Sequence, residues 1–321
     1  MIGCGVVGRK RALALASLGV PVRALYDRDA ARAGELADDL PSNPRVATSA
    51  SEALETDAVN FAVVATTHEA LAETAAAALL HGCDVLVEKP GARRPVELDE
   101  VQRAATASDR AVRVGYNHRF HPAVRAAREI VRDERFGPML WMRARYGHGA
   151  RVGYEKEWRT DASRSGGGEL LDQGSHLIDL TRHLAGPSTL AFAELRASFW
   201  PTEVEDNAFL ALRADAGAFA WLHASWTEWK NCFEVEIALT TARLDLRGLG
   251  GSYGTERLVV HSMPPEMGPP ASAEQTWGDP DDSWRLELED VLGGLAGAKT
   301  IGAGLDDARA VLAIVEEAYD R

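Results

Sequence analysis

The sequence of 321 residues contains little cysteine, no long apolar run and no excess of positive charge. Its three cysteines, Cys4, Cys83 and Cys232, form no C-x-x-C pair and no spacing typical of a metal site. A sparse, odd cysteine count favours reduced thiols over a disulfide framework, so we expect a cytoplasmic protein. The alanine-rich stretch 74–80 is too short to span a bilayer.

The charge balance limits the partners that we expect. With 35 basic and 48 acidic residues, the net charge of −13 argues against binding nucleic acid or an anionic membrane through bulk electrostatics. A local basic pocket for a phosphate-bearing ligand is compatible with this balance. The length allows two domains, and the content of 46% hydrophobic and 26% charged residues is typical of a globular protein.

Short β-like runs alternate with helical patterns over the first 120 residues. We expect strands over 22–26, 45–48, 59–65, 84–87 and 111–116, and helices over 8–18, 30–40, 51–55, 69–81 and 96–108. Helix-end signals support these ranges: Gly19 and Gly82 follow helices, Asp29 and Ser51 precede them, and Pro95 opens one. Strict alternation predicts βαβ units and a parallel doubly wound sheet, with an α+β domain without nucleotide as the alternative.

The pattern changes after residue 119, and we expect two domains, 1–119 and 120–321. A helix over 122–132 and an edge strand over 139–147 precede a β-rich region. Its expected strands are 190–200, 207–215, 218–226, 233–240 and 242–247. Short turns between them predict an antiparallel sheet. Expected loops are 247–254 and 264–282, and expected final helices are 284–295 and 304–319.

The chain opens on a G-x-G-x-x-G spacing, Gly3-Cys4-Gly5-Val6-Val7-Gly8. In such a loop Gly3 allows a tight turn, Gly5 lets the backbone approach a pyrophosphate, and Gly8 lets the helix pack closely. The phosphates bind the free N–H groups at the helix start. The motif therefore predicts a dinucleotide site that includes Val6 and Val7.

Only two residues precede this loop, whereas a strand usually has about five or six. We therefore expect that the natural start lies several residues upstream of Met1, or that the first strand is truncated and its central pairing weakened.

Asp27 ends the second expected strand 19 residues after Gly8, where a carboxylate accepts the ribose hydroxyls of NAD. Alternatively Asp27 caps the next helix, although Asp29 can do so. Arg28 could pair with the 2′-phosphate of NADP, which Asp27 would repel. The sequence thus favours NAD, with NADP as the alternative.

Two further groups of polar residues lie near this loop. Thr66 and Thr67 end the expected strand 59–65, where they could contact ribose or nicotinamide. His68 is either a cofactor neighbour or a polar helix start. Lys10 and Arg11 are expected to be solvated helix charges.

Three residues have the properties of an acid–base site. Lys89 lies at the end of the fifth expected strand. If 170–184 is helical, Asp172 and His176 lie at i and i+4 on one face. Aspartate could orient the histidine as acid or base while lysine donates to the reacting oxygen, which suits removal of a hydroxyl proton as hydride leaves carbon. Alternatively His176 is a structural helix histidine.

Several motifs occur together in this chain. Besides the glycine loop, they are the E-K-P of Glu88-Lys89-Pro90, Gly115-Tyr116-Asn117-His118-Arg119-Phe120, Trp158-Arg159, and a triple glycine followed by the D-x-G-x-H of Asp172 to His176. In this order they resemble the glucose–fructose oxidoreductase / inositol dehydrogenase / MocA (Gfo/Idh/MocA) family over nearly the whole chain. The resemblance implies a Rossmann NAD(P)-binding domain followed by an α+β domain with a large open, mostly antiparallel sheet, whose outer face commonly makes homodimers or homotetramers.

The resemblance also implies roles for individual residues. Lys89 bonds the substrate hydroxyl and orients the nicotinamide, Glu88 lies on the cofactor side, and the Lys89–Pro90 bond is of a kind often found cis. Asp172 orients the substrate, and His176 is the catalytic histidine. The implied residues of the substrate cleft are Tyr116, Asn117, Trp158 and Arg159.

Two other features point less directly to a ligand. His183 invites a metal site with Asp172 and His176, but three ligands on one helix do not readily close a tetrahedral site, so we expect no metal. Arg151 lies in the glycine-rich segment 146–154 and could hold an anionic group of a sugar acid or nucleotide sugar. Alternatively this segment is a surface loop.

The sequence therefore predicts an NAD(P)-dependent oxidoreductase that interconverts a secondary hydroxyl and a ketone on a sugar, cyclitol or nucleotide sugar. One alternative is a family member that retains NAD and uses transient oxidation to cleave a glycosidic bond. Another is a non-catalytic dinucleotide-binding sensor, although such a protein would be free to lose Lys89 and His176, and this chain has both.

Overall fold

The computed structural model describes residues 1–55, 59–278 and 281–321. They form two compact units. The first consists of Met1–Asn117, Ser163–Gly166 and Trp284–Leu312, and the second consists of His118–Ala162, Gly167–Ser283 and Ala313–Arg321. The division into domains 1–119 and 120–321 stays a prediction, but the first compact unit includes a segment from near the end of the chain.

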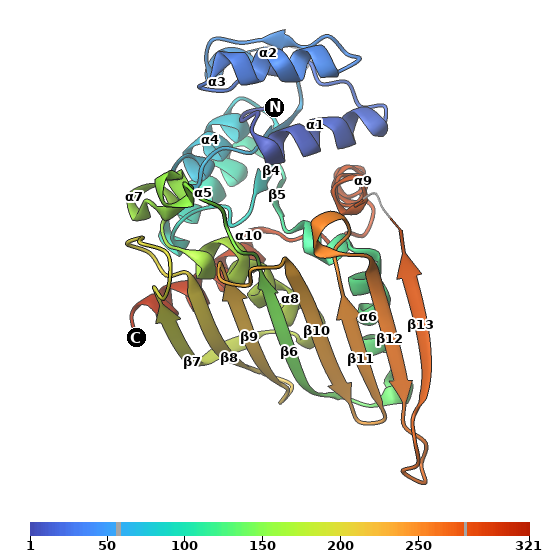
Figure 1. Cartoon of the computed structure of the whole chain (residues 1–321). Helices are drawn as coiled ribbons and strands as arrows, with labels where there is room; N and C mark the ends of the chain where they lie inside the picture. Colours follow the sequence, from blue (N-terminus) through green and yellow to red (C-terminus); the bar gives the residue numbers. More distant parts are fainter. Residues whose placement is uncertain (56–58, 279–280) are drawn as a thin grey trace. The chain divides into compact units, whose positions relative to one another are not determined.

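The first unit is built on parallel strands. They are β1 (Ala24–Leu25), β2 (Arg45–Val46), β3 (Phe61–Val64), β4 (Asp84–Glu88) and β5 (Val112–Gly115). The pairs β1–β2, β3–β4 and β4–β5 are parallel, and Ile2 forms parallel bridges to Tyr26 and Val64. Ile2 therefore joins the two small sheets, which confirms the predicted doubly wound sheet (Figure 1).

Helices alternate with these strands, as the pattern predicts. They are α1 (Val6–Ser17), α2 (Ala30–Asp39), α3 (Ala50–Leu54), α4 (His68–Leu80), η1 (Pro95–Glu97) and α5 (Leu98–Ser108). Asp29 caps α2 by accepting from the Ala31 N–H, as expected. The cap predicted at Ser51 is wrong: Ser49 has the extended backbone that a cap needs, and its hydroxyl accepts from the Glu52 N–H at 3.0 Å.

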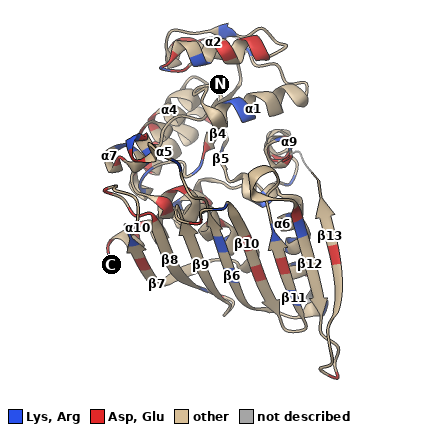
Figure 2. Ribbon diagram, viewed as in Figure 1, with Lys and Arg blue, Asp and Glu red and all other residues tan. Residues whose placement is uncertain are grey.

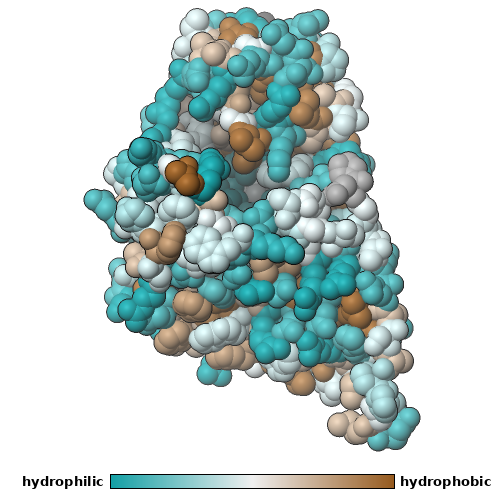
Figure 3. Space-filling model, viewed as in Figure 1, coloured by the Kyte–Doolittle hydropathy of each residue, from teal (hydrophilic) through white to brown (hydrophobic). Residues whose placement is uncertain are grey.

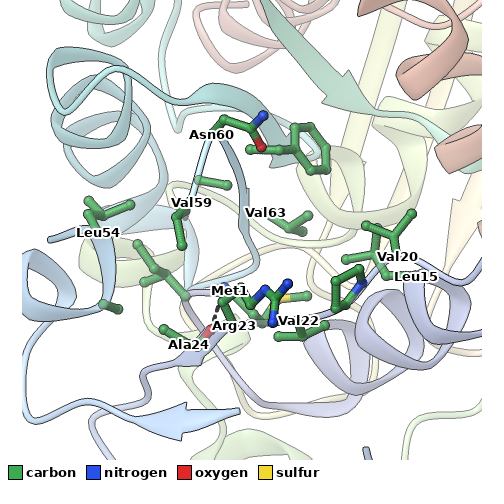
Figure 4. Close-up of a pocket in the computed structure, with 15 residues that line it drawn as sticks. Met1, Leu15, Val20, Val22, Arg23, Ala24, Leu54, Val59, Asn60 and Val63 are labelled. Atoms are coloured by element: carbon green, nitrogen blue, oxygen red, sulfur yellow. Dashed lines mark hydrogen bonds between the residues drawn. The ribbon is translucent and has the colours of Figure 1, made fainter. Parts of the chain in front are cut away.

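The apolar core of the first unit includes side chains from both ends of the sequence. Leu288 and Val291 of α9 (Ser283–Leu295) pack with Leu15, Leu25 and Leu36. A small pocket with about 80 Å³ of free volume lies at the amino ends of the strands, beside Met1, Ala24 and Val63 (Figure 4). Ligands of such sheets bind at the opposite, carboxyl ends, so this pocket is not the candidate site.

The second unit is built on an eight-stranded sheet. Its strands are β6 (Met139–Gly147), β7 (Ser188–Arg196), β8 (Asn207–Ala214), β9 (Phe219–Ser225), β10 (Cys232–Leu239), β11 (Ala242–Arg247), β12 (Glu256–Ser262) and β13 (Ala271–Trp277). Their order is β13-β12-β11-β10-β6-β9-β8-β7, and every pair is antiparallel except β6–β9. The predicted open, mostly antiparallel sheet is confirmed.

The remaining helical segments lie after β5. They are η2 (Asn117–Phe120), α6 (Pro122–Arg132), η3 (Glu134–Phe136), η4 (Tyr154–Lys156), η5 (Trp158–Thr160), α7 (Ala162–Ser165), η6 (Leu170–Gly174), α8 (Ser175–Ala185), η7 (Gly251–Tyr253) and α10 (Leu305–Tyr319).

Two of these helices cover one face of the eight-stranded sheet. Helix α8 packs on β6 and β9, and α6 packs on β11 and β12 (Figure 1). Alternate side chains of each strand therefore face these helices or the other side.

The other face carries ion pairs with apolar side chains among them. Arg143 and Arg243 both contact Glu236, and basic and acidic positions lie on neighbouring strands (Figure 2). The space-filling view shows brown patches between hydrophilic areas (Figure 3). Phe192 and Trp221 stack with centroids 5.8 Å apart, and each is 42% exposed.

Two predictions for the second unit are wrong. The strand 139–147 is not at an edge, because β6 lies between β10 and β9. The segment 264–282 is not all loop, because it contains β13, which pairs with the unpredicted β12; positions 279–280 lie outside the described residues. Strand β13 is an edge strand with almost every residue exposed, so its sequence lacks the apolar alternation that marks a strand.

His183 of α8 makes the stability of the folded protein depend on pH. Burial and the nearby cations Arg119, Arg128 and Arg132 lower the pKa of His183 from 6.5 to about 3. The folded protein therefore keeps this ring neutral, whereas the unfolded chain binds a proton below pH 6.5. Stability from this residue is thus lost as the pH falls below 6.5.

We expect H183Q to lose less stability than the wild type between pH 7 and pH 5, by about 1–2 kcal/mol. Denaturant unfolding at both pH values measures the difference. H81Q is the control, since His81 is exposed. Equal losses in the wild type and H183Q would contradict the assignment.

Candidate active site

The glycine loop lies at the carboxyl ends of the strands of the first unit. A Cβ on Gly3 would lie 2.3 Å from the Ala65 carbonyl oxygen, and one on Gly8 would lie 2.0 Å from the Gly3 carbonyl oxygen. Nothing lies within 4 Å of a Cβ on Gly5. Packing therefore requires Gly3 and Gly8 to be glycine, whereas Gly5 leaves open space in which a ligand can approach the backbone.

The start of α1 has the properties of an anion site. Gly5 is its N-cap, its first turn contains no acidic side chain, and Val6 is 78% exposed. The first N–H groups of a helix have no partner within the helix and carry its positive dipole end. These residues fit the pyrophosphate of a dinucleotide.

Asp27 lies beside this loop, just after β1. One of its carboxylate oxygens accepts from the Cys4 N–H at 2.7 Å, and the other accepts from the Asp29 N–H at 2.9 Å. Each oxygen keeps a further lone pair for a ribose hydroxyl. Arg28 is mostly exposed, and its guanidinium lies 3.9 Å from the Glu69 carboxylate.

The end of β3 carries Thr66, Thr67 and His68. Thr67 is the N-cap of α4, and the Thr66 hydroxyl donates to the Thr67 carbonyl at 3.2 Å. His68 is buried, and its Nδ1 lies 2.8 Å from the Ser165 carbonyl oxygen. His68 therefore has a structural contact within the first unit, and its predicted place beside the cofactor stays a prediction.

The E-K-P motif lies at the end of β4. Glu88 is the last residue of the strand, and the Lys89–Pro90 peptide is cis, as expected. The Glu88 carbonyl accepts from the Gly91 N–H at 2.9 Å. Lys89 therefore occupies a tight turn at the carboxyl edge of the sheet.

The prediction that Arg11 is a solvated charge is wrong. Its guanidinium is fully buried and pairs with Glu88 at 2.6 Å and with Glu287 of α9 at 2.5 Å. Trp284 lies against it, 4.6 Å from ring centroid to guanidinium carbon. Burial lowers the pKa of Arg11 and the two carboxylates raise it, and the net direction is upward. Lys10, by contrast, is exposed as predicted.

In the second unit, the predicted helix 170–184 begins with a different geometry. Leu170–Gly174 forms a π-helix (η6), and the α-helix starts at Ser175. Asp172 therefore lies in the π-turn and His176 in α8. Such π-turns often occur at functional sites, because they re-aim the side chains that they carry.

Asp172 is held by Arg159, and their implied place in a substrate cleft stays a prediction. The Arg159 Nε lies 3.1 Å from the Asp172 carboxylate, and its Nη1 lies 3.6 Å from Glu157. The Arg159 guanidinium also lies over the Trp158 ring at 4.7 Å. Arg151 is mostly exposed and pairs with Glu157 as well. The two arginines thus share one carboxylate.

His176 is buried among rings. Its imidazole stacks on that of His118 with centroids 3.8 Å apart, and the Tyr146 ring lies 6.1 Å away. Tyr253 packs on Tyr146 and accepts a hydrogen bond from Gln173. The sequence patterns identified His176 but neither tyrosine, because Tyr146 and Tyr253 belong to separate segments and carry no motif.

Tyr116 and Asn117 end the first of the three segments that make up the first unit. Both are buried, and the Tyr116 N–H donates to the Val114 carbonyl at 2.9 Å. Their predicted place in a substrate cleft stays a prediction.

The triple glycine before the π-turn is explained by close packing. A Cβ on Gly167 would lie 2.0 Å from the Tyr319 hydroxyl, and one on Gly168 would lie 2.1 Å from the Glu205 carbonyl oxygen. The Glu205 carboxylate accepts from the Gly168 and Leu170 N–H groups and from the Tyr319 hydroxyl. Sequence analysis missed Glu205 and Tyr319, although they fix where the π-turn begins.

Over residues 1–55, 59–278 and 281–321, no group of three His, Cys, Asp or Glu side chains could hold a metal ion. Within those ranges no helix has the length and apolar character needed to cross a membrane.

Family models match both parts of the chain. Residues 1–116 match the oxidoreductase family with an NAD-binding Rossmann fold, and residues 124–245 match the Gfo/Idh/MocA C-terminal domain. The chain therefore belongs to the Gfo/Idh/MocA family of oxidoreductases. The predicted family is confirmed.

Named relatives cover most or part of the chain. A protein of Amycolatopsis mediterranei, assigned as the oxidoreductase subunit of a UDP-kanosamine synthase, is 27% identical over 99% of this chain and 94% of its own length. Inositol 2-dehydrogenase 2 of Saccharopolyspora erythraea is 28% identical over 68% of this chain and 63% of its own. A solved levoglucosan dehydrogenase in complex with NADH and levoglucosan has a TM-score of 0.86 at 21% identity, covering 99% and 96% of the two chains.

Asp27 generates a prediction on cofactor choice. We expect D27N to lower the preference for NADH over NADPH by about tenfold or more, because a hydrogen bond to a charged group is worth about 1.5–3 kcal/mol. The amide also no longer repels a 2′-phosphate. Titration of nicotinamide fluorescence measures both dissociation constants.

D29A is the matched control, because Asp29 caps α2 two residues further on. It should lower stability and leave the ratio of the two dissociation constants unchanged. A D27N ratio equal to that of the wild type would show that Asp27 does not select the cofactor.

Proposed function

We propose that this protein is an NAD-dependent dehydrogenase that interconverts a secondary hydroxyl and a ketone on a sugar, cyclitol or nucleotide sugar. The observation that carries the proposal is the helical segment in which Asp172, bound by Arg159, precedes the buried His176. Family membership and the E-K-P turn of the first unit support it.

The first unit would hold the cofactor. The open backbone at Gly5 and the start of α1 suit the pyrophosphate, and Asp27 suits the ribose. Thr66, Thr67 and Glu88 are the other cofactor contacts that we propose. When bound, the nicotinamide of NAD supplies the acceptor for a hydride.

The chain's own residues would manage the proton and the oxygen. We assign to Lys89 the hydrogen bond to the substrate oxygen, and to His176 the removal of the hydroxyl proton. Asp172 orients the substrate and the histidine, and the Arg159 Nε, which lies 3.1 Å from the Asp172 carboxylate, holds that carboxylate in place. A positioned acid or base of this kind contributes about 10²–10⁴-fold to a rate.

The substrate class follows from the second unit and from the relatives. Arg151 and Arg159 both pair with Glu157, and Arg159 also pairs with Asp172, so the cluster offers charged hydrogen-bonding groups of both signs to a hydroxyl-rich ligand; we assign an anionic group of the ligand to the mostly exposed Arg151. The relatives include proteins named for inositol, levoglucosan and a UDP-sugar. Trp158, Tyr116 and Asn117 complete the substrate contacts that we propose.

The homodimer or homotetramer and the cytoplasmic location also stay proposals. The uncovered face of the eight-stranded sheet supports assembly, because it exposes the stacked pair Phe192 and Trp221 beside Phe219 and Leu140. Exposed apolar groups of this kind gain free energy when a second surface covers them.

Replacing the acid–base residues tests the function. We expect K89M and H176A each to lower turnover of the substrate that the wild type oxidises by about 10²–10⁴-fold, since each removes a group that, in the proposed mechanism, contacts the reacting oxygen. NADH affinity should change by only a few-fold. Absorbance of reduced nicotinamide, with a panel of sugars, cyclitols and nucleotide sugars, measures turnover.

K299M and H81A are matched controls, because both residues are exposed. If turnover survives in both K89M and H176A, the proposed mechanism is wrong. Cofactor that stays bound through purification, with substrate cleaved and no net NADH released, would instead indicate the NAD-retaining type of chemistry. Binding of NADH without turnover of any substrate would indicate a sensor.

Assembly through the sheet face makes a separate prediction. We expect the wild type to exceed the 34.6 kDa of one chain in light scattering at micromolar concentration, and W221E to shift toward that mass, because the glutamate would bury a charge. W229E is the control, since Trp229 is exposed outside the strands. A wild type of single-chain mass would refute the proposal.

A further inference from the structure

Arg11 is a fully buried charged residue of the first unit that the proposed mechanism does not use. It lies on α1, the helix that begins at the glycine loop, yet none of its side chain is exposed. Its two partners come from distant segments, Glu88 at the end of β4 and Glu287 on α9. Arg11 therefore connects the helix that suits the pyrophosphate to the strand end that precedes Lys89.

β4, β5 and α9 pack closely around the contacts of Arg11 with Glu88 and Glu287. Gly115 of β5 lies opposite Glu88 in the strand register, and a Cβ on Gly115 would lie 2.6 Å from the Arg11 Nη2 and 3.0 Å from the Glu88 carboxylate. Trp284 lies over the guanidinium at 4.6 Å. The guanidinium is thus fixed by β4, β5 and α9 together, which leaves it little freedom to move.

Stability alone does not account for such a group. A buried ion pair is often no more stable than apolar residues of the same volume, because both charges must be desolvated. The exposed fractions show where the group is open: the Glu88 side chain keeps 9%, whereas those of Arg11 and Glu287 keep 0% and 1%. Of these three side chains, that of Glu88, the residue next to Lys89, is the most exposed.

We infer that Arg11 is a positioning residue, which holds the Glu88 carboxylate and thereby the Glu88-Lys89-Pro90 turn in the geometry that binds the dinucleotide and the reacting oxygen. Glu287 is the second carboxylate that Arg11 contacts and balances part of the charge of the group. The inference rests on the proposed function, because it gives Lys89 a role in the reaction. Ligands of doubly wound sheets bind at the carboxyl ends of strands, which is where Glu88 lies.

A charge-balanced pair of substitutions separates positioning from folding. R11M alone removes the buried cation that both carboxylates contact and is expected to unfold at a lower temperature. R11M/E287Q removes one positive and one negative charge, so the net charge of the group returns to that of the wild type. We expect its melting temperature to recover to within a few degrees.

The same variant should still bind and react poorly. For R11M/E287Q we expect NADH affinity about tenfold or more below that of the wild type and a lower kcat, because Glu88 has lost its partner. E287Q keeps the contact between Arg11 and Glu88 and should bind NADH within a few-fold of the wild type. R9M is the surface control on the same helix, since Arg9 pairs with the exposed Asp39.

Wild-type NADH affinity and kcat in R11M/E287Q would overturn the inference and leave Arg11 a purely structural residue. If that variant does not fold, R11K decides in the same way: lysine keeps the charge but not the forked contact, and wild-type affinity and kcat would overturn the inference. NADH titration needs no sugar. A wild type that binds NADH but oxidises no substrate would therefore refute the proposed function, while the affinities of the variants would still test Arg11.

Discussion

The close approach of backbone segments at residues 3, 8 and 65 is the constraint on which the first unit depends. At Gly3 and Gly8 a side chain would overlap a carbonyl oxygen, so the strand end, the loop and the start of α1 can meet only if both residues are glycine. That meeting brings the Asp27 carboxylate onto the Cys4 N–H. One packing requirement therefore produces both the open start of α1 and the adjacent Asp27 carboxylate, which are the predicted contacts of the pyrophosphate and the ribose.

A similar constraint organises the second unit. Gly167 and Gly168 allow the Tyr319 hydroxyl and the Glu205 backbone to approach the chain where it enters the π-turn. The Glu205 carboxylate then bonds the first N–H groups of that turn. Because the turn carries Asp172 and leads to His176, Glu205 determines where the helical segment that contains both residues begins.

The sequence was sufficient to predict features that depend on neighbouring residues. Strand–helix alternation, the glycine loop and the cap at Asp29 all arise from spacings of a few residues, and the structure confirms them. Burial of Arg11 could not be predicted, because Glu88 lies 77 residues away and α9 is further still. Strand β13 was missed for a different reason: its side chains are mostly polar and exposed, and only pairing with β12 makes it a strand. The roles of Lys89, Asp172 and His176 stay predictions.

The first unit is built from segments that are far apart in the chain, and this affects when it can finish folding during synthesis. Its core and its buried arginine are complete only when Leu288, Val291 and Glu287 are present, although its strands end at Gly115. The ribosome adds about 5–20 residues per second, so Glu287, the second carboxylate on Arg11, is synthesised on the order of tens of seconds after Arg11. The part of the protein that is made first is therefore the part that finishes folding late, after the whole eight-stranded sheet has been synthesised.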